Sequence, residues 1–251
     1  MVFFNYNGIK IFYEIKKAES KKFLIFIHGS GSSSSIWRYQ FDIDDHYTLI
    51  ALDLPSHSRS DKVETLSLEL YVDVLKKFIE SLDYEEIILC GHSLGGAVIQ
   101  SFYFNNPNLV NKLILVGTGA RLRVSPVILE SLKMNYDKFL KDLPIGAFSR
   151  KTSTDIINEY VKETSSIGPE VTYQDFSICD KFDTINLTST VKIPIIIITG
   201  KEDKLTPLKY ANYFKEKVTN SKLYIIEKAG HMVMIEQPHQ FNEIIKENID
   251  F

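Results

Sequence analysis

Six short apolar runs, spread along a chain of 251 residues, constrain its fold more than any other feature. They occupy residues 23–27, 47–52, 86–90, 112–116, 193–199 and 222–226. Most are continuous rather than alternating, which is typical of strands buried on both faces of a parallel sheet. Ahead of them, residues 3–6 and 9–15 flank Asn7-Gly8, a dipeptide that favours a two-residue hairpin turn. The hairpin and the six runs together predict a sheet of about eight strands.

Helical patterns lie between these runs. Apolar residues recur every three or four positions over residues 70–82, behind Ser67 as a candidate N-cap. A second helix is expected over residues 94–104 and a last one from Pro238. Alternation of strands and helices predicts an α/β fold with a doubly wound, mostly parallel sheet.

Residues 121–187 interrupt this alternation. They contain no convincing strand, and segments 127–143 and 154–164 have helical patterns. Roughly 65 residues are too many for an ordinary connection. We therefore expect a core domain made of residues 1–120 and 188–251, with a helical cap inserted at 121–187.

Composition excludes several classes of protein. Lys and Arg number 29 against 32 Asp and Glu, a net charge of −3, which argues against a nucleic-acid-binding protein. Two cysteines, Cys90 and Cys179, are too few for a disulfide framework or a multi-cysteine zinc site. A single bridge between them stays open, although Cys90 ends an apolar run and is expected in the core.

The location and partners follow from what the sequence lacks. No apolar run approaches the roughly 18 residues of a membrane-spanning helix, and the first residues do not resemble a signal peptide. We expect a cytoplasmic protein that acts on a small molecule, without nucleic acid and without an integral membrane segment. Association into a homodimer is left open.

The strongest chemical signal is the segment Gly91-His92-Ser93-Leu94-Gly95, which follows a predicted strand and precedes a predicted helix. In this context G-x-S-x-G forms a sharp turn that presents a nucleophilic serine. Side chains at the two glycine positions would collide with the flanking strand and helix. The serine would lie at the N-terminus of the helix, where partial positive charge stabilises an anion.

A serine hydroxyl needs a base to become a good nucleophile. Among six histidines, His231 is the best candidate, because a glycine precedes it and it follows the last predicted strand. An imidazole base needs an orienting carboxylate, and Asp203 follows the strand at 193–199. Glu202, one residue away, is its rival. The order Ser93, Asp203, His231 is the chain order of nucleophile, acid and base in one particular fold.

Small residues in His28-Gly29-Ser30-Gly31, after the strand at 23–27, predict an oxyanion hole. We expect the backbone N–H groups of Ser30 and Leu94 to donate to it. One such donor is typically worth about 3 kcal/mol of transition-state stabilisation.

On these residues the chain resembles α/β-hydrolase fold proteins, of the capped serine-hydrolase kind related to carboxylesterases and monoacylglycerol lipases. The resemblance also rests on residues 53–60, on Gly200 to Pro207, and on Gly230-His231 followed by Glu236-Gln237-Pro238. It implies Ser93 as nucleophile, Asp203 as acid, His231 as base, and a lid formed by the insertion. One departure is visible, because Ser56 and Ser58 replace both glycines of the family's D-x-P-G-H-G-x-S segment. We expect the local backbone there to differ.

The predicted function is hydrolysis of carboxylic esters of small or medium apolar substrates through an acyl-enzyme, without metal or organic cofactor. Glycines at positions 29 and 31 and at 117 and 119 imitate a dinucleotide-binding motif, but the third glycine is missing in both. Ser93 excludes chemistry that uses an aspartate nucleophile. Carbon–carbon bond hydrolysis, thioester hydrolysis, perhydrolysis and a receptor-like binding role stay open.

Substrate-binding residues are predicted less specifically. The candidates are Trp37 near the oxyanion loop, Arg121 after the strand at 112–116, Tyr136 and Phe139 in the insertion, and Met232 beside the candidate base. Packing of the cap onto the core is an alternative role for the aromatic residues, and a solvated position is an alternative for Arg121.

Overall fold

The computed structural model describes residues 1–43 and 46–251. Within this part of the chain, eight strands form one sheet in the order β1-β2-β4-β3-β5-β6-β7-β8. The strands are β1 Val2–Tyr6, β2 Ile9–Lys16, β3 Lys22–Ile27, β4 Thr48–Leu52, β5 Glu86–His92, β6 Lys112–Val116, β7 Ile195–Gly200 and β8 Ser221–Ile226. The predicted eight-stranded, mostly parallel sheet is confirmed, with strand ends shifted by one or two residues.

Only the N-terminal part of the sheet is antiparallel. β1 pairs with β2, and β2 with β4, in antiparallel register, whereas β4, β3, β5, β6, β7 and β8 are parallel. The predicted hairpin turns at Asn7 and Gly8, which both have positive φ as a two-residue turn of this kind requires. The carboxyl ends of the parallel strands therefore share one edge of the sheet.

Helices cover both faces of the sheet because strand side chains alternate between them. Ile25 and Ile27 of β3 lie in the core with α1, α2 and α7, whereas Leu24 and Phe26 lie in the core with α8 and α9. The helices are α1 Leu68–Glu80, α2 Leu94–Asn105, α7 Leu208–Lys217, α8 Val233–Glu236 and α9 Pro238–Asn248. The predicted N-cap of α1 is confirmed, since the Ser67 hydroxyl accepts from the Leu70 amide.

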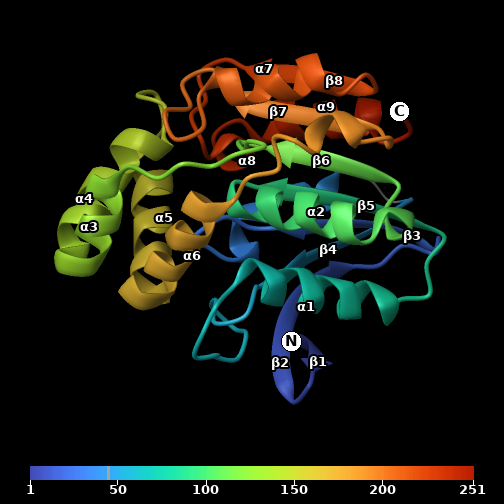
Figure 1. The fold of residues 1–251 in the computed structure, drawn as a ribbon, viewed down its shortest axis with the longest axis horizontal. Coiled ribbons are helices and arrows are strands. Elements are labelled where there is room, and N and C mark those ends of the chain that lie inside the picture. Colours follow the sequence, from blue (N-terminus) through green and yellow to red (C-terminus); the bar gives the residue numbers. More distant parts are fainter. Residues whose placement is uncertain (44–45) are drawn as a thin grey trace.

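Four further helices stand together at one end of the sheet, beside its carboxyl edge (Figure 1). They are α3 Pro126–Met134, α4 Tyr136–Ala147, α5 Thr154–Ile167 and α6 Pro169–Lys181. We call residues 121–187 the cap, as a structural label only. The helical pattern at 127–143 is two helices rather than one, because Asn135 ends α3 and caps α4. The sequence patterns did not indicate α6 or α7. An isolated bridge between Arg121 and Asp183 joins the segments that lead into and out of this group.

Two smaller expectations concern cysteines and membranes. Cys90 and Cys179 are both buried free thiols, so no bridge joins them. Within residues 1–43 and 46–251, no helix combines the length and the apolar character needed to cross a bilayer.

Candidate active site

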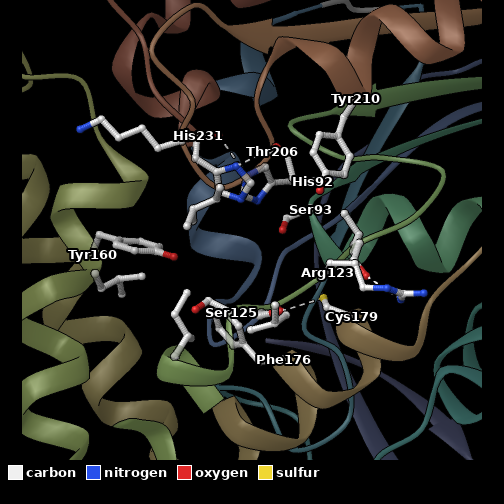
Figure 2. Close-up of a pocket in the computed structure, with 17 residues that line it drawn as sticks. His92, Ser93, Arg123, Ser125, Tyr160, Phe176, Cys179, Thr206, Tyr210 and His231 are labelled. Carbon is white, nitrogen blue, oxygen red and sulfur yellow. Dashed lines mark hydrogen bonds between the residues drawn. The ribbon is translucent and has the colours of Figure 1, made fainter. Parts of the chain in front are cut away.

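Ser93 sits at the sharp turn between β5 and α2. Its backbone has φ 52° and ψ −114°, a conformation that residues with side chains rarely adopt. A Cβ on Gly91 would lie 2.3 Å from the Gly95 carbonyl oxygen, and a Cβ on Gly95 would lie 2.2 Å from that of Ile27. Both positions therefore require glycine, for the reason that the motif predicts. The Ser93 side chain projects into a pocket at the end of the sheet (Figure 2).

His231 and Asp203 meet at the same edge of the sheet, after β8 and β7. His231 Nδ1 lies 2.9 Å from Asp203 Oδ2. The buried carboxylate also accepts from the amides of Leu205 and Thr206 and from the Thr206 hydroxyl. These donors suit an ionised carboxylate, which holds the proton on Nδ1 and leaves Nε2 as the acceptor nitrogen.

Glu202 occupies a different place, although it is adjacent in sequence. Its carboxylate accepts from the Ser149 hydroxyl at 3.0 Å. Asp203, not Glu202, is therefore the residue that contacts His231.

Ser93 and His231 line the same pocket. Among the described residues, no hydrogen bond joins the Ser93 hydroxyl to His231. Hydrogen bonds of this kind are often long until substrate binds.

The backbone of His231 is held by the cap. Its amide donates to the carbonyl of Ala147, the last residue of α4, at 2.8 Å. The neighbouring Met232 amide donates to the same carbonyl at 3.2 Å. The end of α4 therefore fixes the loop that carries the candidate base.

His92, the variable residue before Ser93, packs against His231 with ring centroids 4.5 Å apart. Its Nε2 donates to the His231 carbonyl at 3.1 Å. Burial, together with the nearby His231, lowers the pKa of His92 well below its ordinary value. His92 is therefore neutral, and it packs against the candidate base without adding a charge.

Ser30, on the loop after β3, lines the same pocket as Ser93, and Leu94 is the first residue of α2. The amides at the start of a helix have no partner within the helix, so the Leu94 N–H suits the role that we predict for it. The Cys179 thiol lies 3.5 Å from the Ser30 hydroxyl. Burial raises the pKa of Cys179 to about 12, so this residue is a neutral thiol and no rival nucleophile.

Cap residues form the apolar wall of the pocket. Tyr160 of α5 and Phe176 of α6 lie across the pocket from Ser93 (Figure 2). Leu122, Val124, Ile128 and Leu143 extend this wall, Leu205 of the core completes it, and the polar residues include Arg123, Lys204 and Tyr210. The cavity encloses about 190 Å³, below the roughly 300–1,000 Å³ of sites for drug-sized ligands.

None of the five predicted substrate-binding residues is among those that line this pocket. Trp37 is fully buried between Phe26 and Phe241, and Met232 is fully buried as well. These two belong to the core, because their large apolar side chains fill the layer under α9.

The other three residues make contacts within the cap. Arg121 forms an ion pair with Asp183 outside the pocket. Tyr136 stacks on Phe139, and its hydroxyl donates to the Thr164 carbonyl. Their predicted role in substrate binding is not supported by these positions.

Sequence reasoning missed Thr206 and Asp175. Thr206 donates to Asp203 and lies 3.2 Å from His231 Nδ1; its place three residues after the acid was a usable signal. Asp175 is a fully buried carboxylate on α6, and no motif marks it. No cluster of three or more His, Cys, Asp or Glu side chains that could hold a metal ion occurs in the part of the chain that the structure describes.

Ser56 and Ser58, which replace two glycines, have φ of 67° and 46°. Both thus adopt the left-handed region that favours glycine. The Ser56 hydroxyl bonds both the amide and the carbonyl of Val63, which offsets part of the strain. Both φ values are ones that a glycine at the same position could adopt.

Residues 24–244 match the model of the alpha/beta hydrolase family. The chain belongs to this family. Its structure superimposes on that of a thermophilic esterase with a TM-score of 0.88 and 35% sequence identity, over 99% of this chain and 96% of the other.

Relatives with assigned activities are hydrolases of different kinds. A pimeloyl-(acyl-carrier protein) methyl ester esterase of Proteus mirabilis is 27% identical, over 90% of this chain and 92% of its own. A 2-hydroxy-6-oxononadienedioate/2-hydroxy-6-oxononatrienedioate hydrolase of Pseudomonas putida is 25% identical, over 90% and 87%. The family therefore supports a hydrolase and leaves the substrate to be argued from the site.

Proposed function

We propose that this hydrolase cleaves carboxylic esters of small or medium apolar substrates through an acyl-enzyme on Ser93. One observation carries the proposal. A strained turn presents Ser93 in a pocket that also contains His231, whose other ring nitrogen is bound by the buried Asp203. The residues that we assign as nucleophile, base and orienting carboxylate thus come from three distant segments to one edge of the sheet, which supports the proposal.

In the proposed first step, His231 Nε2 accepts the Ser93 proton as the hydroxyl oxygen attacks the ester carbonyl. The negative charge on the carbonyl oxygen is stabilised by the N–H groups of Ser30 and Leu94. His231 then returns its proton to the leaving alcohol, and the acyl-enzyme forms. Water repeats these steps and releases the acid.

The pocket supports an apolar substrate of limited size. Most of its apolar wall consists of aliphatic and aromatic cap residues, and the cavity is small. Residues 121–187 would then act as the cap that excludes water and selects the acyl group. Thr206 supports the acid by donating to the Asp203 oxygen that faces His231.

Carbon–carbon bond hydrolysis is the second candidate. The relative from Pseudomonas putida carries the name of such a substrate, which is a diacid. Arg123 and Lys204 line the pocket here, and either cation could bind a carboxylate. Because of these two cations, the experiment also includes a substrate for carbon–carbon bond hydrolysis.

Fluorophosphonate labelling followed by peptide mapping tests the proposal. We expect one label, on the peptide that contains Ser93, in the wild type and in Ser101→Ala, a change in the same helix away from the pocket. Ser93→Ala should lose the label. A panel of p-nitrophenyl esters and a 2-hydroxy-6-oxo dienoate then separates the two activities. Turnover of esters at about 1–1,000 per second is expected for an esterase, and a folded protein that takes no label and turns over no ester contradicts the proposal.

A further inference from the structure

Asp175 joins the cap to the loop that carries Ser30. The side chain extends from α6 and is fully buried. Its Oδ2 accepts from the Gly31 amide and from His57 Nε2, both at 2.9 Å, and its Oδ1 accepts from the Tyr71 hydroxyl at 2.7 Å. One carboxylate of the cap thus binds three separate segments of the core.

The partners of His57 identify it as a cation. Its Nδ1 lies 2.9 Å from the Pro55 carbonyl, which can only accept, and its Nε2 faces the Asp175 carboxylate. Both ring nitrogens therefore carry protons. Burial disfavours this charged form, but the Asp175 carboxylate, the Pro55 carbonyl and Asp53 together outweigh burial, and the pKa of His57 lies above its ordinary value.

His28, whose ring lies 4.7 Å from that of His57, is in the opposite state. Its Nδ1 donates to the Gly29 carbonyl at 2.8 Å, and its Nε2 accepts from the Leu54 amide at 3.0 Å. One nitrogen is thus a donor and the other an acceptor, as in a neutral imidazole. Burial and the charge of His57 lower the pKa of His28 to about 4.

Together these bonds fix the peptide that supplies the Ser30 N–H. The Gly29 carbonyl and the Ser30 N–H belong to one trans peptide, in which the two groups point in opposite directions. Because His28 holds the carbonyl on one side, the N–H points to the other. Asp175 then holds the next amide, that of Gly31, so the chain is fastened on both sides of Ser30.

We propose that Asp175 is a positioning residue for the oxyanion hole, through which the cap, with His57, holds the Ser30 N–H in its working direction. This inference rests on the proposed function. The docked cap would thereby add a second restraint to a peptide that His28 of the core holds on its other side. Because a mispositioned donor weakens binding of the transition state and not of the substrate, loss of Asp175 should lower kcat and leave KM nearly unchanged.

The test compares Asp175→Asn with two matched variants. Glu163→Gln changes another cap carboxylate, which binds the hydroxyls of Ser33 and Ser35 farther along the same loop. Tyr71→Phe removes one hydrogen bond from Asp175 and leaves those to Gly31 and His57. Rates are expressed per serine labelled by fluorophosphonate, which removes the contribution of unfolded protein.

For Asp175→Asn we expect kcat to fall about 10- to 100-fold, somewhat less than for the loss of a whole oxyanion donor, with KM within threefold of the wild type. The Kd of a trifluoromethyl ketone, which forms a tetrahedral adduct on a serine, should rise by a similar factor. Both matched variants should stay within threefold in kcat, even where their Tm falls.

Two results would overturn the proposal. One is a kcat per labelled serine in Asp175→Asn equal to that of Glu163→Gln; the other is a loss confined to KM. If Asp175→Asn does not fold, His57→Gln replaces it, with a fall in kcat of about threefold or more expected and an unchanged kcat overturning the proposal. Absence of any ester turnover in the wild type would instead refute the proposed function.

Discussion

The sheet core and the cap are built in different ways. In α2, which lies against the sheet, nine of twelve residues are buried, whereas in α5 of the cap two of fourteen are. The core is held by apolar packing on both faces of the sheet. The cap relies more on particular polar contacts, such as those of Asp175 and of the Ala147 carbonyl. The two regions thus differ in what holds them: apolar packing dominates in the core, and a few polar anchors add to the packing of the cap.

Replacing Ser93 tests whether the chemistry belongs to the core. We expect Ser93→Ala to lower kcat about a million-fold, on the scale known for nucleophilic serines, or roughly 8 kcal/mol. Steady-state hydrolysis of a p-nitrophenyl ester measures this loss. A fall in kcat below about tenfold would mean that another residue is the nucleophile, and residues of the cap would then be tested.

The two adjacent acidic residues sharpen the comparison within one loop. Asp203→Asn should lower kcat about ten-thousandfold, because the amide favours the wrong tautomer of His231. Glu202→Gln is the control and should remain within a few-fold of the wild type, since Glu202 contacts Ser149. The reverse ranking of the two variants in kcat would show that the acid is assigned to the wrong residue.

Two aromatic residues separate stability from specificity. Trp37→Ala removes a fully buried core side chain and should cost about 3–5 kcal/mol of unfolding free energy, measured by denaturant titration. Its preference among ester chain lengths should not change. Phe176→Ala, in the cap wall, should instead alter that preference roughly tenfold with a smaller loss of stability. A change of chain-length preference in Trp37→Ala alone would reverse the roles assigned to core and cap.

The stability contributed by the contact between core and cap should depend on pH. His57 faces Asp175 on α6, Tyr71 on α1, His28 after β3 and Asp53 after β4. Because its folded-state pKa is raised, its stabilising contribution is complete below about pH 6.5, the ordinary pKa of histidine. The contribution is lost as pH rises through the folded-state pKa.

Thermal unfolding between pH 5 and 9 tests this expectation. Tm should decline on the alkaline side in the wild type, and His57→Gln should remove part of that decline. Equal alkaline slopes for the two proteins would show that His57 carries no stabilising charge.

The sequence predicted the core well and the cap poorly, for physical reasons. Continuous apolar runs mark strands that are buried on both faces, and the turn at Ser93 requires glycines whose spacing is local. In contrast, α6 of the cap buries Thr172, Asp175, Ile178 and Cys179, a half-polar set that gives no clear apolar period. The one core helix that was missed, α7, buries only Ala211 and Phe214, which is also too weak a pattern to recognise. The role of Asp175 depends on partners 104 and 144 residues away in the chain, and no local pattern encodes them.

The sequence was also insufficient to predict which side chains line the pocket. An apolar side chain such as that of Trp37 or Met232 satisfies a core position and a ligand site equally well in sequence. For Trp37 the packing against Phe26 and Phe241 decides for the core, and for Met232 its complete burial does. Likewise the sequence does not distinguish Asp203 from Glu202 as the acid. The choice depends on which of the two carboxylates the turn after β7 places beside His231.

The bond from the His231 amide to the Ala147 carbonyl limits how reactants reach the pocket. A wide swing of α4 away from the sheet would have to break this bond or draw the loop of His231 with it. If the proposed function holds, the bond favours entry and exit through smaller motions of side chains at the pocket rim. The same few residues would then select substrates both at the entrance of the pocket and inside it.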